Sequence, residues 1–126
     1  MTTWYSAEDT LELQRLLEAW PDAPLDREEV LGMILDVAKV QVIAFGVGIP
    51  EDVLPEDVVL VDDEGEEIDP PPRFVYAQLQ QATNLWNAGR VSSAGDVGMD
   101  GYTFTPRPLD QTIRGIIRPL DLTNVF

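Results

Sequence analysis

The sequence predicts a mainly α-helical protein: a small bundle of three to four helices with a short β element and an extended C-terminal tail. Apolar residues recur at helical spacing in three long segments, and proline or glycine bounds each of them. Strand-like alternation is confined to short stretches. Since 126 residues is the length of one domain, we expect a single domain over 1–126. Its predicted parts are a helical core at about 6–89, a loop, short strand and short helix at 90–118, and the tail at 119–126.

The first helix is predicted over about residues 7–19, after an arm at 1–5. Ser6, with Asp9 three residues later, forms a capping-box pattern that has Asp in place of Glu or Gln. Pro21 ends the helix. Its apolar stripe consists of Leu13, Leu16, Leu17 and Trp20.

The second helix should extend from the capping residue Asp26 to Gly46. Acidic residues cluster in its first turn, where the helix dipole favours them. β-Branched residues leave a strand as the alternative for 40–45, but the helical spacing is unbroken across that stretch. We therefore predict a buried central helix with the apolar positions Val30, Leu31, Ile34, Leu35, Ala38, Val42 and Phe45.

The stretch at 46–72 predicts a short hairpin that turns near Glu64 and Gly65. Acidic side chains surround this glycine and would keep the turn in water. The predicted acidic patch consists of Asp62, Asp63, Glu64, Glu66 and Glu67.

The third helix is predicted to begin within the prolines at 70–72 and to end at Gly89. A glycine-rich loop at 90–101 and a short strand at 102–105 should follow. Asp110 is placed to cap a last short helix. The apolar stripe of the third helix consists of Val75, Leu79, Ala82 and Trp86.

The residue types that are missing exclude several classes of chemistry. Without cysteine or histidine the chain has no disulfide, thiolate nucleophile, imidazole base or common zinc site. No apolar run approaches the about 18 residues of a membrane span, and the N-terminus lacks the pattern of a signal peptide. We expect a soluble intracellular or particle-associated protein.

The charge is divided unevenly along the chain. Residues 1–72 hold 19 acidic and 3 basic residues, whereas 73–126 hold 4 acidic and 5 basic residues. The acidic part gains nothing from counterion release, so ordinary nucleic-acid binding is disfavoured. The C-terminal part could accept an acidic surface of a partner or of a neighbouring copy.

Catalytic and metal-binding motifs are not found. The glycines at 46 and 48 are not followed by the third glycine of a dinucleotide loop, and Lys39 is the single lysine. A calcium loop centred on Gly65 would place Leu60 and Pro71 at ligand positions. We therefore expect no catalytic, cofactor-binding or metal-ligating residues and no enzymatic activity. A looser divalent-ion site at the acidic patch, and a metal hydrolase that uses carboxylates alone, stay as alternatives.

Asp36 and the three tryptophans lie outside the catalytic and metal-binding motifs considered above. Asp36, inside the apolar second helix, is expected to be exposed, since a catalytic carboxylate would need an apolar pocket. Trp20 and Trp86, at helical spacing, are expected to belong to the core. Trp4 lies outside any pattern, and two roles remain open for it: packing on its own fold or contacting a neighbour.

The last quarter of the chain contains the candidate interface. Arg114 and Arg118 are four residues apart, so both should lie on one side of the short helix, away from its isoleucines. Arginine suits bidentate pairing with a partner's carboxylates, although a solvated face is the alternative. The apolar tail must fold back or enter another chain. The predicted portal or neighbour interface consists of Arg107, Arg114, Arg118, Leu120, Leu122, Val125 and Phe126.

Several motifs together resemble the head-to-tail adaptor (connector) proteins of long-tailed bacteriophages, the actinobacteriophage branch above all. The resemblance covers about residues 70–119 well and 25–46 loosely. Its motifs are Pro72-Arg73-Phe74, Ala77-Gln78-Leu79, Leu85-Trp86-Asn87-Ala88-Gly89-Arg90, the glycine-rich stretch through Gly95-Asp96 and Gly98, Pro108-Leu109-Asp110 and Ile113-Arg114-Gly115-Ile116-Ile117-Arg118-Pro119.

This resemblance implies a non-enzymatic virion protein at the head-tail interface, assembled in the host cytoplasm. Such adaptors form a ring, usually of twelve copies, beneath the portal protein and extend the DNA channel to a tail-side stopper or completion protein. DNA passes through without specific binding. Carried over to this chain, Arg114, Arg118 and the tail from Leu120 to Phe126 would face the portal.

The charge pattern is compatible with that role. A ring of carboxylates would give a DNA channel a repulsive lining, so we expect the acidic patch to face the channel or the outer rim. Mutual repulsion of the copies would have to be offset by neutral contacts or by pairs with the C-terminal arginines. The competing interpretation is an acidic partner-binding protein, such as a DNA mimic that inhibits a nucleic-acid-binding protein.

Overall fold

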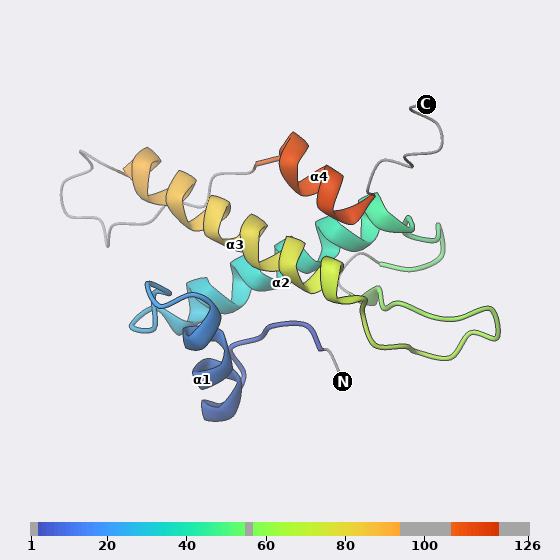
Figure 1. Cartoon of the computed structure of the whole chain (residues 1–126), viewed down its shortest axis with the longest axis horizontal. Helices are drawn as coiled ribbons and strands as arrows, with labels where there is room; N and C mark the ends of the chain where they lie inside the picture. Colours follow the sequence, from blue (N-terminus) through green and yellow to red (C-terminus); the bar gives the residue numbers. More distant parts are fainter. Residues whose placement is uncertain (1–2, 55–56, 94–106, 119–126) are drawn as a thin grey trace.

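Two long antiparallel helices form the centre of the molecule. The structure is a computed structural model that describes residues 3–54, 57–93 and 107–118. Helices α2 (Glu28–Gly46) and α3 (Pro72–Ser93) pack along each other, and α4 (Gln111–Ile117) packs beside α3 and the end of α2. Helix α1 (Thr10–Ala19) lies on the opposite side of this pair from α4 (Figure 1). The predicted mainly helical fold is thus confirmed.

Two apolar clusters stabilise this arrangement, one at each end of the α2–α3 pair. In the first, α1 and the turn after it pack against α2 and α3 through buried side chains such as Leu16, Trp20 and Leu85. In the second, α4 and residues 58–60 pack against the other end through Ile113, Ile117 and Phe74. The helices are therefore held by burial of apolar surface, the main driving force of folding.

Helix α1 begins later than the capping-box pattern predicts. Asp9, not Ser6, is the N-cap, and its carboxylate accepts the N–H of Glu12 at 2.9 Å. An aspartate supplies this acceptor as well as a serine does, so either residue was competent to cap the helix. Residues 6–8 instead link the helix to a docked N-terminal arm.

Helix α2 confirms the central helix and excludes the strand alternative for 40–45. Val42 and Ile43 are wholly buried on its inner side. Asp26 does not cap it, because the N-cap is Arg27 and no side chain accepts a hydrogen bond there. Helix α2 forms without a side-chain cap because burial of its apolar face supplies most of the stability of a helix in a protein.

Helix α3 starts in the prolines as predicted but passes Gly89 and ends at Ser93. Glycine ends a helix when it adopts a positive φ, and Gly89 is not among the described glycines that do so. The first residues of the predicted 90–101 loop are therefore helical. The rest of that loop and the predicted strand at 102–105 lie outside the described residues.

The predicted hairpin is present as a turn with one isolated β-bridge, between Val61 and Glu67. Gly65 has a φ of 83°, a left-handed conformation that favours glycine. The Asp62 carboxylate accepts the N–H groups of Glu64 and Glu66 at 2.9 and 3.0 Å. Within the described residues the short β element is thus a bridge and not a strand.

Helix α4 is capped as predicted, since the Asp110 carboxylate accepts the N–H of Ile113 at 2.8 Å. Its buried side chains are Ile113 and Ile117. The predicted extended tail at 119–126 lies outside the described residues. In the part of the chain that the structure describes, no helix has the length and apolar character to cross a membrane.

Candidate interaction surfaces

Arg114 and Arg118 lie together on the outside of α4, as their spacing predicts. Their guanidinium carbons are 6.0 and 4.7 Å from the centre of the Phe45 ring on α2. Both side chains are exposed, whereas Ile113 and Ile117 point into the core. A guanidinium stacked on a ring is held in place while its N–H edges stay free.

A third arginine, Arg73 on the first turn of α3, lies at the same end of α4. Sequence reasoning missed this residue as an interface candidate. Its Nε donates to the carbonyl of Ile117 at 3.1 Å, and its guanidinium carbon is 5.2 Å from the centre of the Phe74 ring. The bond satisfies a carbonyl at the C-terminal end of α4 and ties α3 to that end. We call Arg73, Arg114 and Arg118 the arginine surface. Among the described residues, no carboxylate forms an ion pair with it.

Arg107 does not belong to this group. It precedes the N-terminal end of α4, whereas Arg114 and Arg118 lie toward the other end. Its carbonyl accepts the side-chain amides of Gln41 and Gln81 at 2.8 and 2.9 Å, and its side chain is exposed. Arg107 thus contributes a main-chain bridge, and the predicted interface is divided between two ends of α4.

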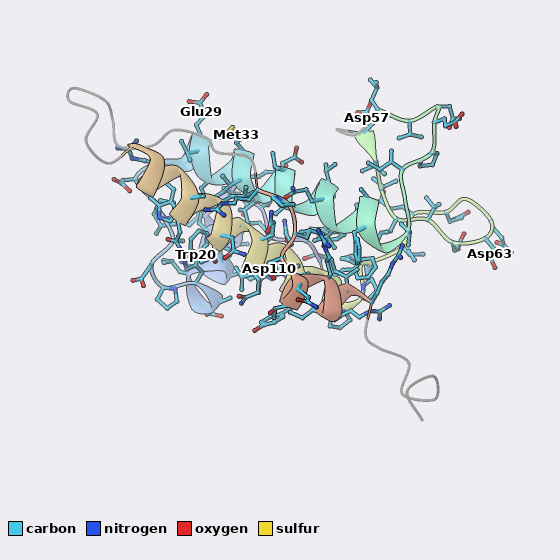
Figure 2. All side chains as sticks on the ribbon, turned by 90° about the horizontal axis from the view of Figure 1, so that it is seen from above. Trp20, Glu29, Met33, Asp57, Asp63 and Asp110 are labelled. Carbon is cyan, nitrogen blue, oxygen red and sulfur yellow. The ribbon has the colours of Figure 1, made fainter. Side chains whose placement is uncertain are left out.

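The acidic patch lies on a loop that projects from the molecule. All five of its carboxylates are exposed, and Asp63 lies at the far end of the loop (Figure 2). The stem of the loop also exposes Val59, Val61 and Ile68, with 41%, 50% and 43% of their surface accessible. Contiguous exposed apolar surface is a feature of interaction sites. Across the described residues, no group of three or more acidic side chains is placed to hold a metal ion.

The tryptophans and Asp36 lie largely as expected. Asp36 is exposed on α2, Trp20 is buried, and Trp86 packs partly buried against the first cluster. Trp4 packs on its own fold: its ring is 6.5 Å from that of Phe74. Its side chain is only partly buried, so part of it remains accessible to another contact.

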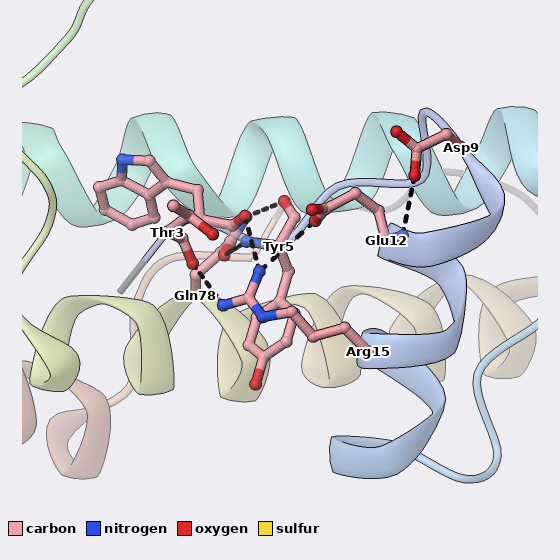
Figure 3. Close-up of polar contacts among 7 residues, drawn as sticks. Thr3, Tyr5, Asp9, Glu12, Arg15 and Gln78 are labelled. Atoms are coloured by element: carbon pink, nitrogen blue, oxygen red, sulfur yellow. Dashed lines mark hydrogen bonds and ion pairs between the residues drawn. The ribbon is translucent and has the colours of Figure 1, made fainter. Parts of the chain in front are cut away.

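A wholly buried glutamine on α3 fastens the N-terminal arm, which we define as residues 3–5. Gln78 accepts the N–H of Tyr5 at 2.8 Å and donates to the carbonyl of Tyr5 at 3.0 Å (Figure 3). It also donates to the carbonyl of Leu35 on α2 at 3.0 Å. Arg15 on α1 donates to the carbonyls of Thr3 and Trp4, and its guanidinium lies 4.2 Å from the centre of the Tyr5 ring. Sequence reasoning missed these hydrogen bonds to the arm, since nothing in the sequence near Gln78 marks it as a buried polar residue.

The apolar tail residues Leu120, Leu122, Val125 and Phe126 lie outside the described residues, so their predicted interface role stays a prediction. Comparisons of the chain with protein-family models, with curated proteins and with solved structures found no match. A function for this chain is therefore supported by its sequence and its geometry alone.

Proposed function

We propose that this chain is a structural, non-enzymatic subunit of a bacteriophage head-to-tail connector. Copies would form a ring, probably of twelve, beneath the portal protein and carry the DNA channel toward a tail-side stopper or completion protein. The observation that carries the proposal is the arginine surface: three guanidinium groups, positioned by rings and a helix end, that no described carboxylate neutralises.

The arginine surface suits a carboxylate-rich protein partner. Stacking on Phe45 and Phe74 restricts the guanidinium groups before binding, so less side-chain entropy is lost when they pair. Exposed single ion pairs contribute little, whereas several charges desolvated in one interface contribute more. The portal or a neighbouring copy would supply the carboxylates.

The acidic patch suits a channel or a rim for the same electrostatic reason. Carboxylates on a projecting loop repel a phosphate backbone and allow DNA to pass without being bound. The apolar stem below the patch gives the loop a surface on which it could rest against another subunit.

The mass of the purified chain, alone and mixed with portal protein, tests this proposal. We expect a monomer alone and a ring on the portal, seen by native mass spectrometry or light scattering. Truncation after Pro119 should leave folding intact but abolish attachment. No complex between full-length chain and portal would contradict the proposal, and loss of folding on truncation would place the tail in the core.

Charge reversal of Glu64, Glu66 and Glu67 to lysine tests the position of the acidic patch. If these residues line the channel, lysines would attract the DNA backbone, and DNA passage should be slowed or trapped. The measurement is the rate of DNA ejection from particles that carry the variant. Normal ejection from fully assembled particles would remove the channel assignment and leave the rim.

An acidic partner-binding protein or DNA mimic is the second candidate, and the exposed row of carboxylates on the projecting loop favours it. Such a protein would be captured by a basic DNA-binding protein, and DNA would compete with it for that partner. A connector would show neither behaviour, so a pull-down with DNA competition discriminates the two functions.

A further inference from the structure

The N-terminal arm is held through its main chain by two side chains of the folded body. Gln78 binds both the N–H and the carbonyl of Tyr5, and Arg15 binds the two preceding carbonyls. Among the described residues, no backbone–backbone hydrogen bond joins the arm to a helix. The groups that recognise the arm therefore stay in place if the arm leaves, and they recognise an extended backbone whatever chain supplies it.

Two aromatic side chains add selectivity to this backbone recognition. Trp4 lies near the Phe74 ring, and the Lys39 ammonium is 6.0 Å from the centre of the Trp4 ring. Tyr5 lies under the guanidinium of Arg15. An extended segment with two consecutive aromatic residues, Trp then Tyr, is what this site fits.

The arm occupies its site incompletely. Trp4 and Tyr5 are only half-buried, and a cavity of about 420 Å³ lies beside the arm, with Met33, Asp36 and Lys39 on α2 among its lining residues. Gln78, in contrast, is wholly buried, and its amide would lose two of its three hydrogen bonds, keeping only the one to Leu35, if the arm left. An empty site would leave a buried amide without these two hydrogen bonds, so the folded body loses more stability when the site is empty than the arm loses when it is released.

We propose that this site exchanges its own arm for the arm of a second copy of the chain. The second copy is the fitting occupant because its residues 3–5 reproduce every contact described above. Only the linker at 6–8, between the arm and the Asp9 cap, has to change direction. Exchange of identical segments is a low-cost route to association, and it becomes favourable where copies are held side by side at high effective concentration. This inference does not depend on the connector function.

A peptide-binding measurement on the full chain tests the exchange. The Tyr5→Pro variant removes the N–H that Gln78 accepts and should leave the site open. A fluorescent peptide with the sequence of residues 1–8 should bind this variant at least about tenfold more tightly than it binds the wild type, whose own arm competes for the site. The same peptide N-methylated at the Tyr5 nitrogen should bind about tenfold more weakly. Failure of the peptide to bind Tyr5→Pro, or equal binding of both peptides, would overturn the proposal.

A mixing experiment tests exchange between whole chains. Gln78→Leu keeps an arm that can bind but loses the amide that recognises its backbone. Tyr5→Pro keeps the amide but has an arm that lacks the N–H for it. We expect native mass spectrometry to show a heterodimer in the mixture and monomers of each variant alone. A mixture that stays monomeric while both variants give the wild-type circular dichroism spectrum would overturn exchange. If Gln78→Leu does not fold, the peptide measurement alone decides.

Discussion

Replacing Gly46 with alanine should lower the free energy of unfolding by about 2 kcal/mol, because a methyl group there has no room. A Cβ on this last residue of α2 would lie 2.6 Å from Cζ of Phe74 and 3.2 Å from Cγ2 of Ile117. Both side chains are buried, with 4% and 2% of their surface accessible. Phe74 would have to move within the packed core or strain its rotamer. The higher helix propensity of alanine, about 1 kcal/mol, offsets only part of this cost.

Gly32→Ala is the matched control on the same helix. Apart from its chain neighbours and the nearby backbone of α2, no atom lies within 4 Å of the Cβ position, and Gly32 is inside α2 without a positive φ. This variant should raise stability by up to about 1 kcal/mol. Urea unfolding monitored by circular dichroism measures both, and we expect the midpoint of Gly46→Ala to fall by about 1 M. Equal stabilisation by the two alanines would mean that α2, α3 and α4 do not meet at Gly46.

The helices could be predicted from the sequence because their evidence is local. The spacing of Val42 and its neighbours marks a buried helix whatever the helix packs against. The start of α1 could not be predicted, because it depends on a contact between residues 73 positions apart. Gln78 holds Tyr5, so residues 6–8 bridge from that anchor to Asp9, and Ser6 is not available as a cap.

The residues of the candidate surfaces also differ in whether local spacing or a long-range contact places them. Arg114 and Arg118 were predicted together because four residues of helix separate them. Arg73 was missed because its partner, the carbonyl of Ile117, is 44 positions away. The exposure of Val59 and Val61 could not be predicted from the sequence. These valines alternate with the buried Val58 and Leu60, and such a pattern does not show whether another segment covers the outward side. Long-range contacts of this kind need a structure.

Reversing both charges of α4, with Arg114→Glu and Arg118→Glu in one chain, should weaken attachment to the portal-bound ring at least about 100-fold. The loss exceeds that of an exposed ion pair because each new carboxylate would face the carboxylates that the arginine is proposed to meet. Folding should persist, since Ile113 and Ile117 keep α4 in the core and only the stacking on Phe45 is lost. Co-sedimentation with portal protein measures attachment, and thermal unfolding checks the fold.

Arg107→Glu separates a specific surface from a general effect of charge. It changes the charge by the same amount per residue but lies before the N-terminal end of α4, where its carbonyl and not its guanidinium makes the described contacts. We expect it to attach nearly as the wild type does. Higher salt should weaken wild-type attachment more than the residual attachment of the double variant, because screening acts on the charges that the variant has lost. Equal damage from Arg107→Glu would show that net charge is what matters, and unchanged attachment of the double variant would remove the arginine surface from the interface.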